Sequence, residues 1–260
     1  MNVINADEVR YISINGVKVE SLQNKMAEGS VHLIGSTIKE KIKILVTKDK
    51  AQTWYEVKLD NGKFDEKIWL NSGKGKYTVA IMVNETERKY SYGPKFAVEN
   101  IEEVDKYSVP GKYIESHDDK IIKLAEEIIS DLDSDLEKAQ AIHNWVSKNI
   151  NYDYEKYSKH LSSNYDNQYG ALITLESKKG VCFDYAALVA AIGRAAGLQT
   201  KMVKGEGVNQ SFRGYHAWNE IYISEENRWV KLDATFSSTS GQDYFDSAKF
   251  DESHIKAEEC

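Results

Sequence analysis

Cysteine is scarce in this chain of 260 residues, which contains only Cys182 and Cys260. Two thiols exclude a framework of several disulfides, and they exclude a structural zinc site with four cysteine ligands. Long apolar runs are also missing, because no stretch approaches the roughly 18 to 20 consecutive apolar residues that a membrane helix needs. We therefore predict no membrane span in this chain. Its opening segment lacks the basic and then apolar regions of a signal peptide.

An excess of basic residues is absent as well. Residues 1–105 contain 16 Lys plus Arg and 16 Asp plus Glu, whereas residues 106–260 contain 18 against 25, which places the net charge of −7 on the second part. An acidic surface repels phosphates, so nucleic acid is not expected as a partner. The charge suits a cationic or lysine-bearing substrate, although a solvated acidic surface is the simpler interpretation.

Residues 10 to 99 have the pattern of short strands. Apolar residues alternate with polar ones, as in Ile42, Ile44 and Val46, and turn signals such as Asn15-Gly16 separate the runs. About seven such strands predict a β-sandwich over residues 1–105. The stretches at residues 62–64 and 75–79 resemble immunoglobulin-like modules that precede enzymes on bacterial surfaces, without their Cys-Trp-Cys core. This resemblance implies an extracellular or cell-surface location and a binding or spacer role.

The pattern then becomes helical, and the boundary is expected at residues 100–115. Ser116 to Asp119 and then Ser134 predict the capped starts of two helices. A tyrosine- and asparagine-rich loop is predicted at residues 151–168, followed by a helix from Cys182 to Ala196 that ends at Gly197. Strands are predicted near 198–204, 214–223 and 227–234. Residues 106–260 are thus predicted to form a second, α+β domain.

Cys182 is the first candidate for chemistry. It lies at the expected first turn of a strongly apolar helix, where the positive end of the helix dipole favours the thiolate over the thiol. Gly180 lets the backbone turn sharply, which leaves the Cys182 amide free to face a developing oxyanion. The alternative is a small cysteine buried in a core helix.

A predicted hairpin supplies partners for this thiol. If Ile223 pairs with Arg228 across the short loop, Trp218 lies opposite Asp233 and His216 is one diagonal step away on the same face. A histidine that takes the thiol proton and a carboxylate that fixes the histidine tautomer are the partners a thiol enzyme needs. A slip of one residue in register would separate them.

Three segments of the chain resemble the signature of the transglutaminase-like superfamily. They surround Cys182, His216 and Asp233, which follow one another at intervals of 34 and 17 residues. The resemblance covers about residues 106 to 256, and only Ala234 departs from it, where proline is frequent. It implies a papain-like core, with helices packed on an antiparallel sheet and these three residues as the catalytic triad.

Further site residues are predicted around the triad. Gln168 or Tyr169 is a candidate for the second oxyanion donor, as a side chain upstream of the nucleophile is in this superfamily, and the alternative is a plain loop role. Trp218 is a candidate wall of the substrate groove or else a core residue. The remaining histidines show no ligand spacing and are expected on helix surfaces or loops: His32, His117, His143, His160 and His254. We predict no metal and no organic cofactor.

The predicted function is that of a thiol acyl-transferase or hydrolase. Cys182 would attack a protein glutamine carboxamide or a peptide amide, and an amine or water would then resolve the acyl-enzyme. The alternatives are a cysteine protease or amidase acting on cell-surface substrates and a non-catalytic binding module. The expected partners are a protein or peptide substrate and a cell-surface partner of the N-terminal module.

Overall fold

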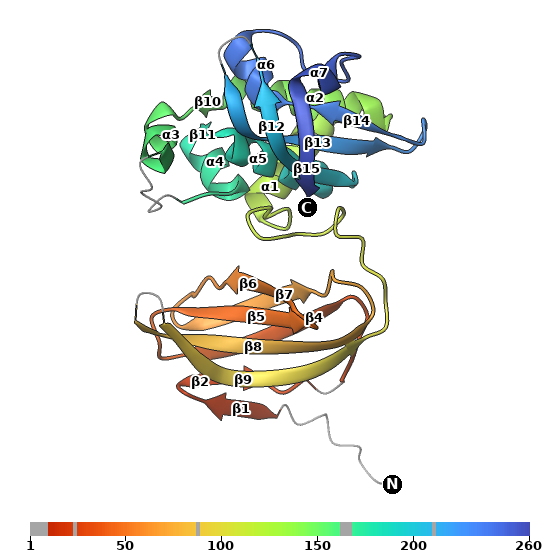
Figure 1. Ribbon diagram of the computed structural model, residues 1–260. Coiled ribbons are helices and arrows are strands. Elements are labelled where there is room, and N and C mark those ends of the chain that lie inside the picture. Colours follow the sequence, from red (N-terminus) through yellow and green to blue (C-terminus); the bar gives the residue numbers. More distant parts are fainter. Residues whose placement is uncertain (1–9, 23–24, 87–88, 162–167, 210–211) are drawn as a thin grey trace. The chain divides into compact units, whose positions relative to one another are not determined.

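The computed structural model describes residues 10–22, 25–86, 89–161, 168–209 and 212–260. The chain divides into two compact units, Met1–Asp105 and Lys106–Cys260, and each has its own buried core (Figure 1). Within the described part of the chain, every helix is too short or too polar to span a membrane.

The N-terminal unit is a sandwich of two sheets. One sheet has the order β1 (Tyr11–Ile14), β2 (Val17–Glu20), β4 (Ser30–Thr37) and β7 (Lys63–Trp69). The other has the order β3 (Met26–Ala27), β9 (Lys89–Asn100), β8 (Gly75–Thr86), β5 (Ile42–Lys48) and β6 (Ala51–Glu56). Alternate apolar side chains of the two sheets share one core, as the period-two pattern requires.

The predicted β-sandwich is confirmed, with two strands more than expected. Asn15 and Gly16 both have positive φ, 51° and 77°, and form the tight turn of the β1–β2 hairpin. The turn was recognisable in the sequence, but β2 and the two-residue β3 were not.

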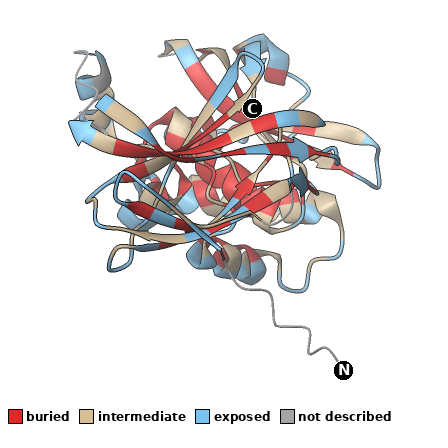
Figure 2. Ribbon diagram, turned by 90° about the horizontal axis from the view of Figure 1, so that it is seen from below, coloured by how far each residue is buried: buried red, intermediate tan, exposed pale blue. Residues whose placement is uncertain are grey.

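The C-terminal unit places helices on an antiparallel sheet, as predicted. The sheet has the order β14 (Arg228–Leu232), β13 (Arg213–Ile223), β12 (Thr200–Val208) and β15 (His254–Glu259). Helix α5 (Cys182–Ala195) packs on β12 and β13 and is buried along almost its whole length. Figure 2 shows buried residues gathered on the inner parts of helices and strands, with exposed ones mostly in loops and outer segments. The helices α1 (Asp119–Ile129), α2 (Asp135–Asn149) and α4 (Ala171–Ser177) pack against α5.

The predicted helix ends agree with the structure, but the connections differ. Asp118 caps α1, Ser134 forms a capping box on α2, and Gly197 follows α5 with φ of 81°. The predicted loop at 151–168 instead contains the strand β10 (Asn151–Tyr152), paired with β11 (Lys179–Gly180), and the helix α3 (Tyr154–Leu161). After β14 come two unpredicted short helices, α6 (Ala234–Ser240) and α7 (Phe250–Ser253), and the unpredicted strand β15.

Candidate active site

Cys182 is the first residue of α5 and is 8% exposed. The preceding turn depends on Gly180, because a Cβ at that position would lie 2.6 Å from Cβ of Asp184. The glycine is therefore needed for close packing against the first turn of the helix, and its φ is not in the left-handed region. The thiol is thus held at the positive end of a long helix, as predicted from the sequence.

Asp184 holds this turn through its carboxylate. Its oxygens accept hydrogen bonds from the backbone N–H groups of Val181 at 2.9 Å and Gly170 at 3.2 Å. Lys156 of α3 adds an ion pair, with Nζ 2.6 Å from Oδ2 of Asp184. Burial raises the pKa of Asp184, and Lys156 opposes that rise. The sequence indicated only a favourable dipole position for Asp184, and it gave no signal for Lys156.

The β13–β14 hairpin has the predicted register, with Ile223 opposite Arg228 and regular pairing up to Leu232. The ladder stops one residue before Asp233, because that residue caps α6. Oδ1 of Asp233 accepts from the N–H groups of Thr235 at 2.8 Å and Phe236 at 3.0 Å. The carboxylate therefore sits at the end of the hairpin, on the face that carries His216.

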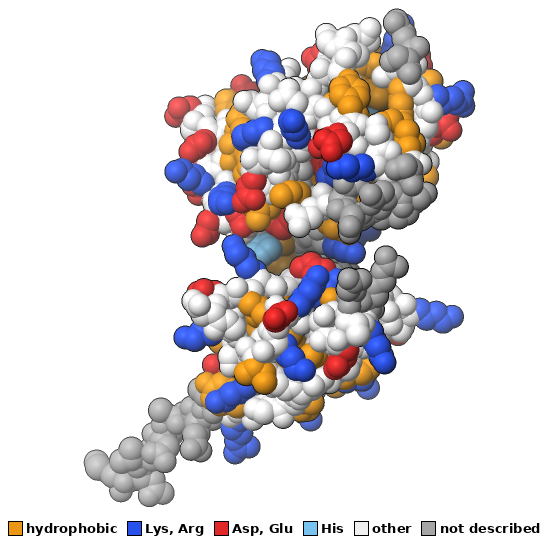
Figure 3. All heavy atoms as spheres, turned by 90° about the vertical axis from the view of Figure 1, so that its left-hand side faces the viewer, with side chains coloured by type: hydrophobic (Ala, Val, Ile, Leu, Met, Phe, Trp, Pro, Cys, Tyr) orange, Lys and Arg blue, Asp and Glu red, His pale blue; other side chains and the backbone are white. Residues whose placement is uncertain are grey.

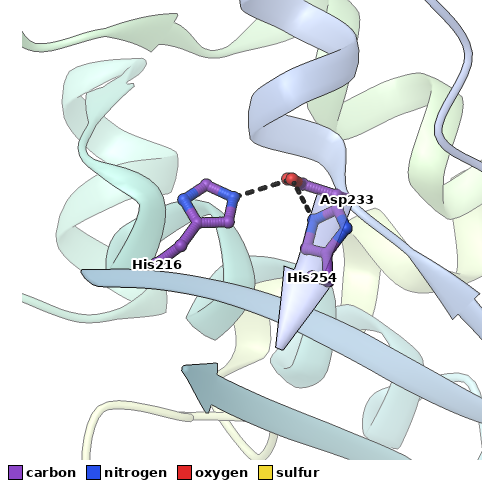
Figure 4. A group of neighbouring side chains, drawn as sticks. All are labelled: His216, Asp233 and His254. Carbon is purple, nitrogen blue, oxygen red and sulfur yellow. Dashed lines mark hydrogen bonds and ion pairs between the residues drawn. The ribbon is translucent and has the colours of Figure 1, made fainter. Parts of the chain in front are cut away.

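His216 and Asp233 are in direct contact. Nε2 of His216 lies 2.7 Å from Oδ2 of Asp233, and both residues are almost completely buried (Figure 4). Burial favours the neutral acid, but the charge and hydrogen bond of His216 hold the pKa of Asp233 well below its usual range. Because Nε2 is used by Asp233, Nδ1 is the ring atom of His216 that remains for a thiol.

Cys182 acts on the same imidazole electrostatically. Burial lowers the pKa of His216, but the charge and hydrogen bond of Asp233, followed by the hydrogen bond and charge of Cys182, raise it to about 10. Helix α5, which begins with Cys182, packs on β13, which carries His216. Asn219 connects these two elements, because its buried amide donates to Ala186 O of α5 at 2.9 Å.

The two predicted oxyanion candidates lie in the segment before α4. Gln168 is exposed, and its backbone carbonyl accepts a hydrogen bond from Lys156 Nζ at 2.6 Å. The ring of Tyr169 packs edge-on against Phe183 and beneath the Lys156 ammonium, which is 4.1 Å from the ring centroid. Both residues therefore contact Lys156. An oxyanion role for either stays a prediction.

Trp218 does not line an open groove. It is 2% exposed, and its ring lies 4.9 Å from the ring of His254 and 6.4 Å from that of Phe250. Trp218 shares a strand face with His216, and that face is covered at this point by the segment from α7 to β15. Trp218 therefore packs as a core residue beside His216.

Two histidines expected at the surface are buried. His143 is 1% exposed and His254 is 4% exposed. His143 packs on Phe245, and burial lowers its pKa. His254 reaches the site itself, with Nε2 3.0 Å from Oδ2 of Asp233 (Figure 4). The side chain of His160 lies outside the described residues.

His216, Asp233 and His254 are also residue types that bind metal ions. Within the described residues, His216, Asp233 and His254 are the three whose ligand atoms lie within 4.8 Å of one another. A zinc ion bonds nitrogen at roughly 2.0 to 2.1 Å and takes its place between its ligands. Here both Nε2 atoms contact the same carboxylate oxygen directly, at 2.7 and 3.0 Å. The arrangement is therefore that of a hydrogen-bonded carboxylate.

Two tyrosine side chains are influenced by the charge of Cys182. The charge of Cys182 acts on Tyr152 and on Tyr215, and burial together with this charge raises the pKa of Tyr215 to about 12. Figure 3 shows hydrophobic side chains gathered around a hollow on the face of this unit that carries α3.

Residues 122–234 match the transglutaminase-like superfamily. The chain is 34% identical over 125 residues to the kyphoscoliosis peptidase of Mus musculus, covering 45% of this chain and 18% of that protein. It is 25% identical over 169 residues to the uncharacterized protein YebA of Bacillus subtilis, covering 58% of this chain and 22% of that protein.

A solved structure described as a TGase covers 65% of this chain and 48% of its own, with a TM-score of 0.38 and 19% identity. The chain spans about a fifth of the length of the curated relatives named above. The match to the superfamily includes Cys182, His216 and Asp233. The C-terminal unit of this protein therefore contains a domain of the transglutaminase-like superfamily.

Proposed function

We propose that this protein is a cysteine enzyme that cleaves amide bonds of protein or peptide substrates through an acyl-enzyme. The observation that carries the proposal is the buried 2.7 Å contact between His216 and Asp233, on a strand against which the helix that begins with Cys182 packs. A base fixed by a carboxylate on one side and facing a thiol on the other is the arrangement that nucleophilic catalysis requires.

The reaction begins with transfer of the thiol proton from Cys182 to Nδ1 of His216. The thiolate sulfur attacks the carbonyl carbon, and the resulting oxyanion is stabilised at the N-terminus of α5, where the backbone N–H of Cys182 is a first-turn donor. The C–N bond then breaks, and His216 returns its proton to the leaving nitrogen. Asp233 stays ionised throughout and stabilises the imidazolium.

The acyl-enzyme then needs an acceptor. His216 removes a proton from water or from a substrate amine, the acceptor attacks the thioester carbonyl, and the thiolate leaves. Water gives a protease or amidase, whereas a lysine amine gives a crosslinking transferase. Hydrolysis has support from the relatives of mouse and human, 34% and 33% identical over 125 residues, which are both named peptidases. A transferase has support from the resemblance to transglutaminases.

The N-terminal sandwich is proposed to bind a partner, and the protein is proposed to act outside the cell or at its surface. The support is the resemblance of residues 1–105 to modules that precede surface enzymes, together with the absence of a nucleophile and base pair in that unit's sequence. A non-catalytic binding role for the whole protein is the weaker candidate, since all three triad residues are present.

The test compares the Cys260→Ser protein with the Cys182→Ala/Cys260→Ser protein, so that only one thiol differs. Each is incubated with a glutamine-containing protein and a fluorescent primary amine, and gels report amine incorporation and cleavage while a coupled assay reports ammonia. Incorporation identifies a transferase, cleavage a protease, and ammonia release alone an amidase. Equal signals from the two proteins in all three assays would overturn the proposal.

A further inference from the structure

Among the described residues, His254 is the side chain bonded to Asp233 that the mechanism above does not use. It begins β15, on the far side of Asp233 from His216, and is 4% exposed. Its Nε2 lies 3.0 Å from the same Oδ2 that accepts from His216 (Figure 4). This residue lies beyond the segment 122–234 that matches the superfamily, so its contact is supplied by a separate part of the chain.

The hydrogen-bond geometry fixes the direction of this contact. An ionised carboxylate only accepts, so both histidines donate from Nε2 to Oδ2 of Asp233. Nδ1 of His254 lies 3.1 Å from the carbonyl oxygen of Phe250 and 2.9 Å from the hydroxyl of Ser253. That hydroxyl also donates to the same carbonyl at 3.0 Å. Nε2 of His254 is thus the donor to Asp233, while Phe250 and Ser253 hold the ring in place at Nδ1.

The surrounding chain is built to hold this ring in place. The His254 ring stacks on Phe250 at 3.9 Å with an interplanar angle of 15°. Strand β12 has Gly205 where β15 crosses, and a Cβ there would lie 2.0 Å from Ile255 O and 2.9 Å from the Trp218 ring. Any larger residue would push β15 away from the site. The end of β15 is fixed by a backbone pair between Cys260 and Met202.

We propose that His254 is a positioning residue for the catalytic triad. By donating to Oδ2, it holds the Asp233 carboxylate in the orientation in which that oxygen faces His216, and it keeps Asp233 ionised in a site that excludes water. Without this donor, a carboxylate buried to 0% exposure has one hydrogen-bond partner fewer, and the carboxyl is free to rotate or take up a proton. The catalytic consequence of this inference rests on the proposed function. The hydrogen bond from His254 to Asp233 does not depend on it.

The test uses His254→Met and His254→Gln in the full chain with Cys260→Ser. The two side chains have nearly the same shape, but only glutamine has an N–H to donate to Asp233. Alkylation of Cys182 by iodoacetamide is measured, since it needs no known substrate. We expect the methionine variant to react about 10- to 100-fold more slowly, the range for loss of one hydrogen bond to a charged group, and glutamine to restore most of the rate.

A purely structural role is separated by repeating both variants with Asp233→Ala. If His254 acts through Asp233, the methionine and glutamine variants react equally in that background. The inference would be overturned if Cys182 reacted at the same rate in the folded methionine variant, the folded glutamine variant and the parent. It would also be overturned if the methionine substitution slowed alkylation equally with and without Asp233.

NMR of protein labelled with ¹⁵N-histidine provides the second measurement, which is independent of activity. We expect a protected Nε2–H signal from His254 that is lost with Asp233→Ala, and its absence in the parent would overturn the inference. If Cys182 of the parent reacts no faster than a free thiol while this signal is present, the proposed function fails and the hydrogen bond from His254 stands.

Discussion

The buried ion pair between Lys156 and Asp184 gives the most direct test of how the nucleophile is held. Replacing Lys156 by methionine removes the ammonium but keeps most of the apolar stem. The Asp184 side chain is 0% exposed and would lose the cation that pairs with it. Breaking such a pair by removing one partner costs about 3 to 5 kcal/mol.

The expected loss lies at the lower end of this range. Two of the three hydrogen bonds to the Asp184 carboxylate come from backbone N–H groups and survive the substitution, at 2.9 and 3.2 Å. A loss of about 3 kcal/mol in a domain of this size lowers Tm by roughly 6 to 12 °C. Calorimetry of the full chain measures this as a downward shift of the C-terminal transition, with the N-terminal transition unchanged.

The pH dependence makes this prediction specific. Burial already raises the folded-state pKa of Asp184, and the loss of Lys156 raises it further. A carboxyl whose folded pKa exceeds its unfolded value favours folding at low pH and loses that contribution as pH rises through the folded pKa. The Lys156→Met protein should therefore be less destabilised, relative to wild type, at about pH 5 than at about pH 8.

Lys159→Met is the matched control, because it makes the same substitution on the same helix at an exposed pair with Glu155. An exposed pair of this kind contributes little, so Tm should hardly change. The reasoning about a buried charge is wrong if Lys156→Met has the same Tm as Lys159→Met. It is also wrong if the loss of stability of Lys156→Met relative to wild type is the same at both pH values.

Three further results are expected. Asp233→Asn should lower kcat by up to about 10⁴-fold, less than the complete loss in Cys182→Ala, and enzyme assays beside a thermal melt will show whether the fold survives. The folded-state pKa of His216 is raised to about 10, so its contribution to stability is full below an unfolded-state pKa of about 6.5 and is lost toward pH 10. The free energies of unfolding of wild type and His216→Asn, measured in urea, should therefore converge over that interval. A constant difference between them would contradict this. A fragment of residues 106–260 should fold alone, because that unit has its own core, and a fragment without a cooperative melt would refute this.

The parts of the site that were predictable are those set by local pattern. The start of α5 follows from one glycine, one cysteine and an unbroken apolar run. The register of β13 and β14 follows from a short loop and regular alternation, and the observed pairing from Ile223–Arg228 onward agrees with it. Contacts between neighbouring strands joined by a tight turn are the long-range contacts that a sequence specifies best.

The contacts that were missed depend on segments without such a pattern. Strand β15 is almost entirely exposed after His254, so no alternation marks it as a strand. Helix α3 lies in a stretch rich in tyrosine and charge, and it is held by Lys156 on Asp184 and by Asp153, whose carboxylate accepts from the Lys156 N–H at 2.9 Å. Tertiary contacts here override weak local preference.

The burial of Asp233 explains why the candidate site needs α6 and β15, which the sequence pattern did not predict. A carboxylate taken fully out of water loses several kcal/mol of solvation, which one hydrogen bond to His216 does not offset. Oδ1 recovers part of this from the two N–H groups at the start of α6, at 2.8 and 3.0 Å. Oδ2 has only side-chain donors, His216 at 2.7 Å and His254 at 3.0 Å. Since the nucleophile needs His216 on its other side, the second donor has to come from elsewhere in the chain, and β15 supplies it by pairing with β12.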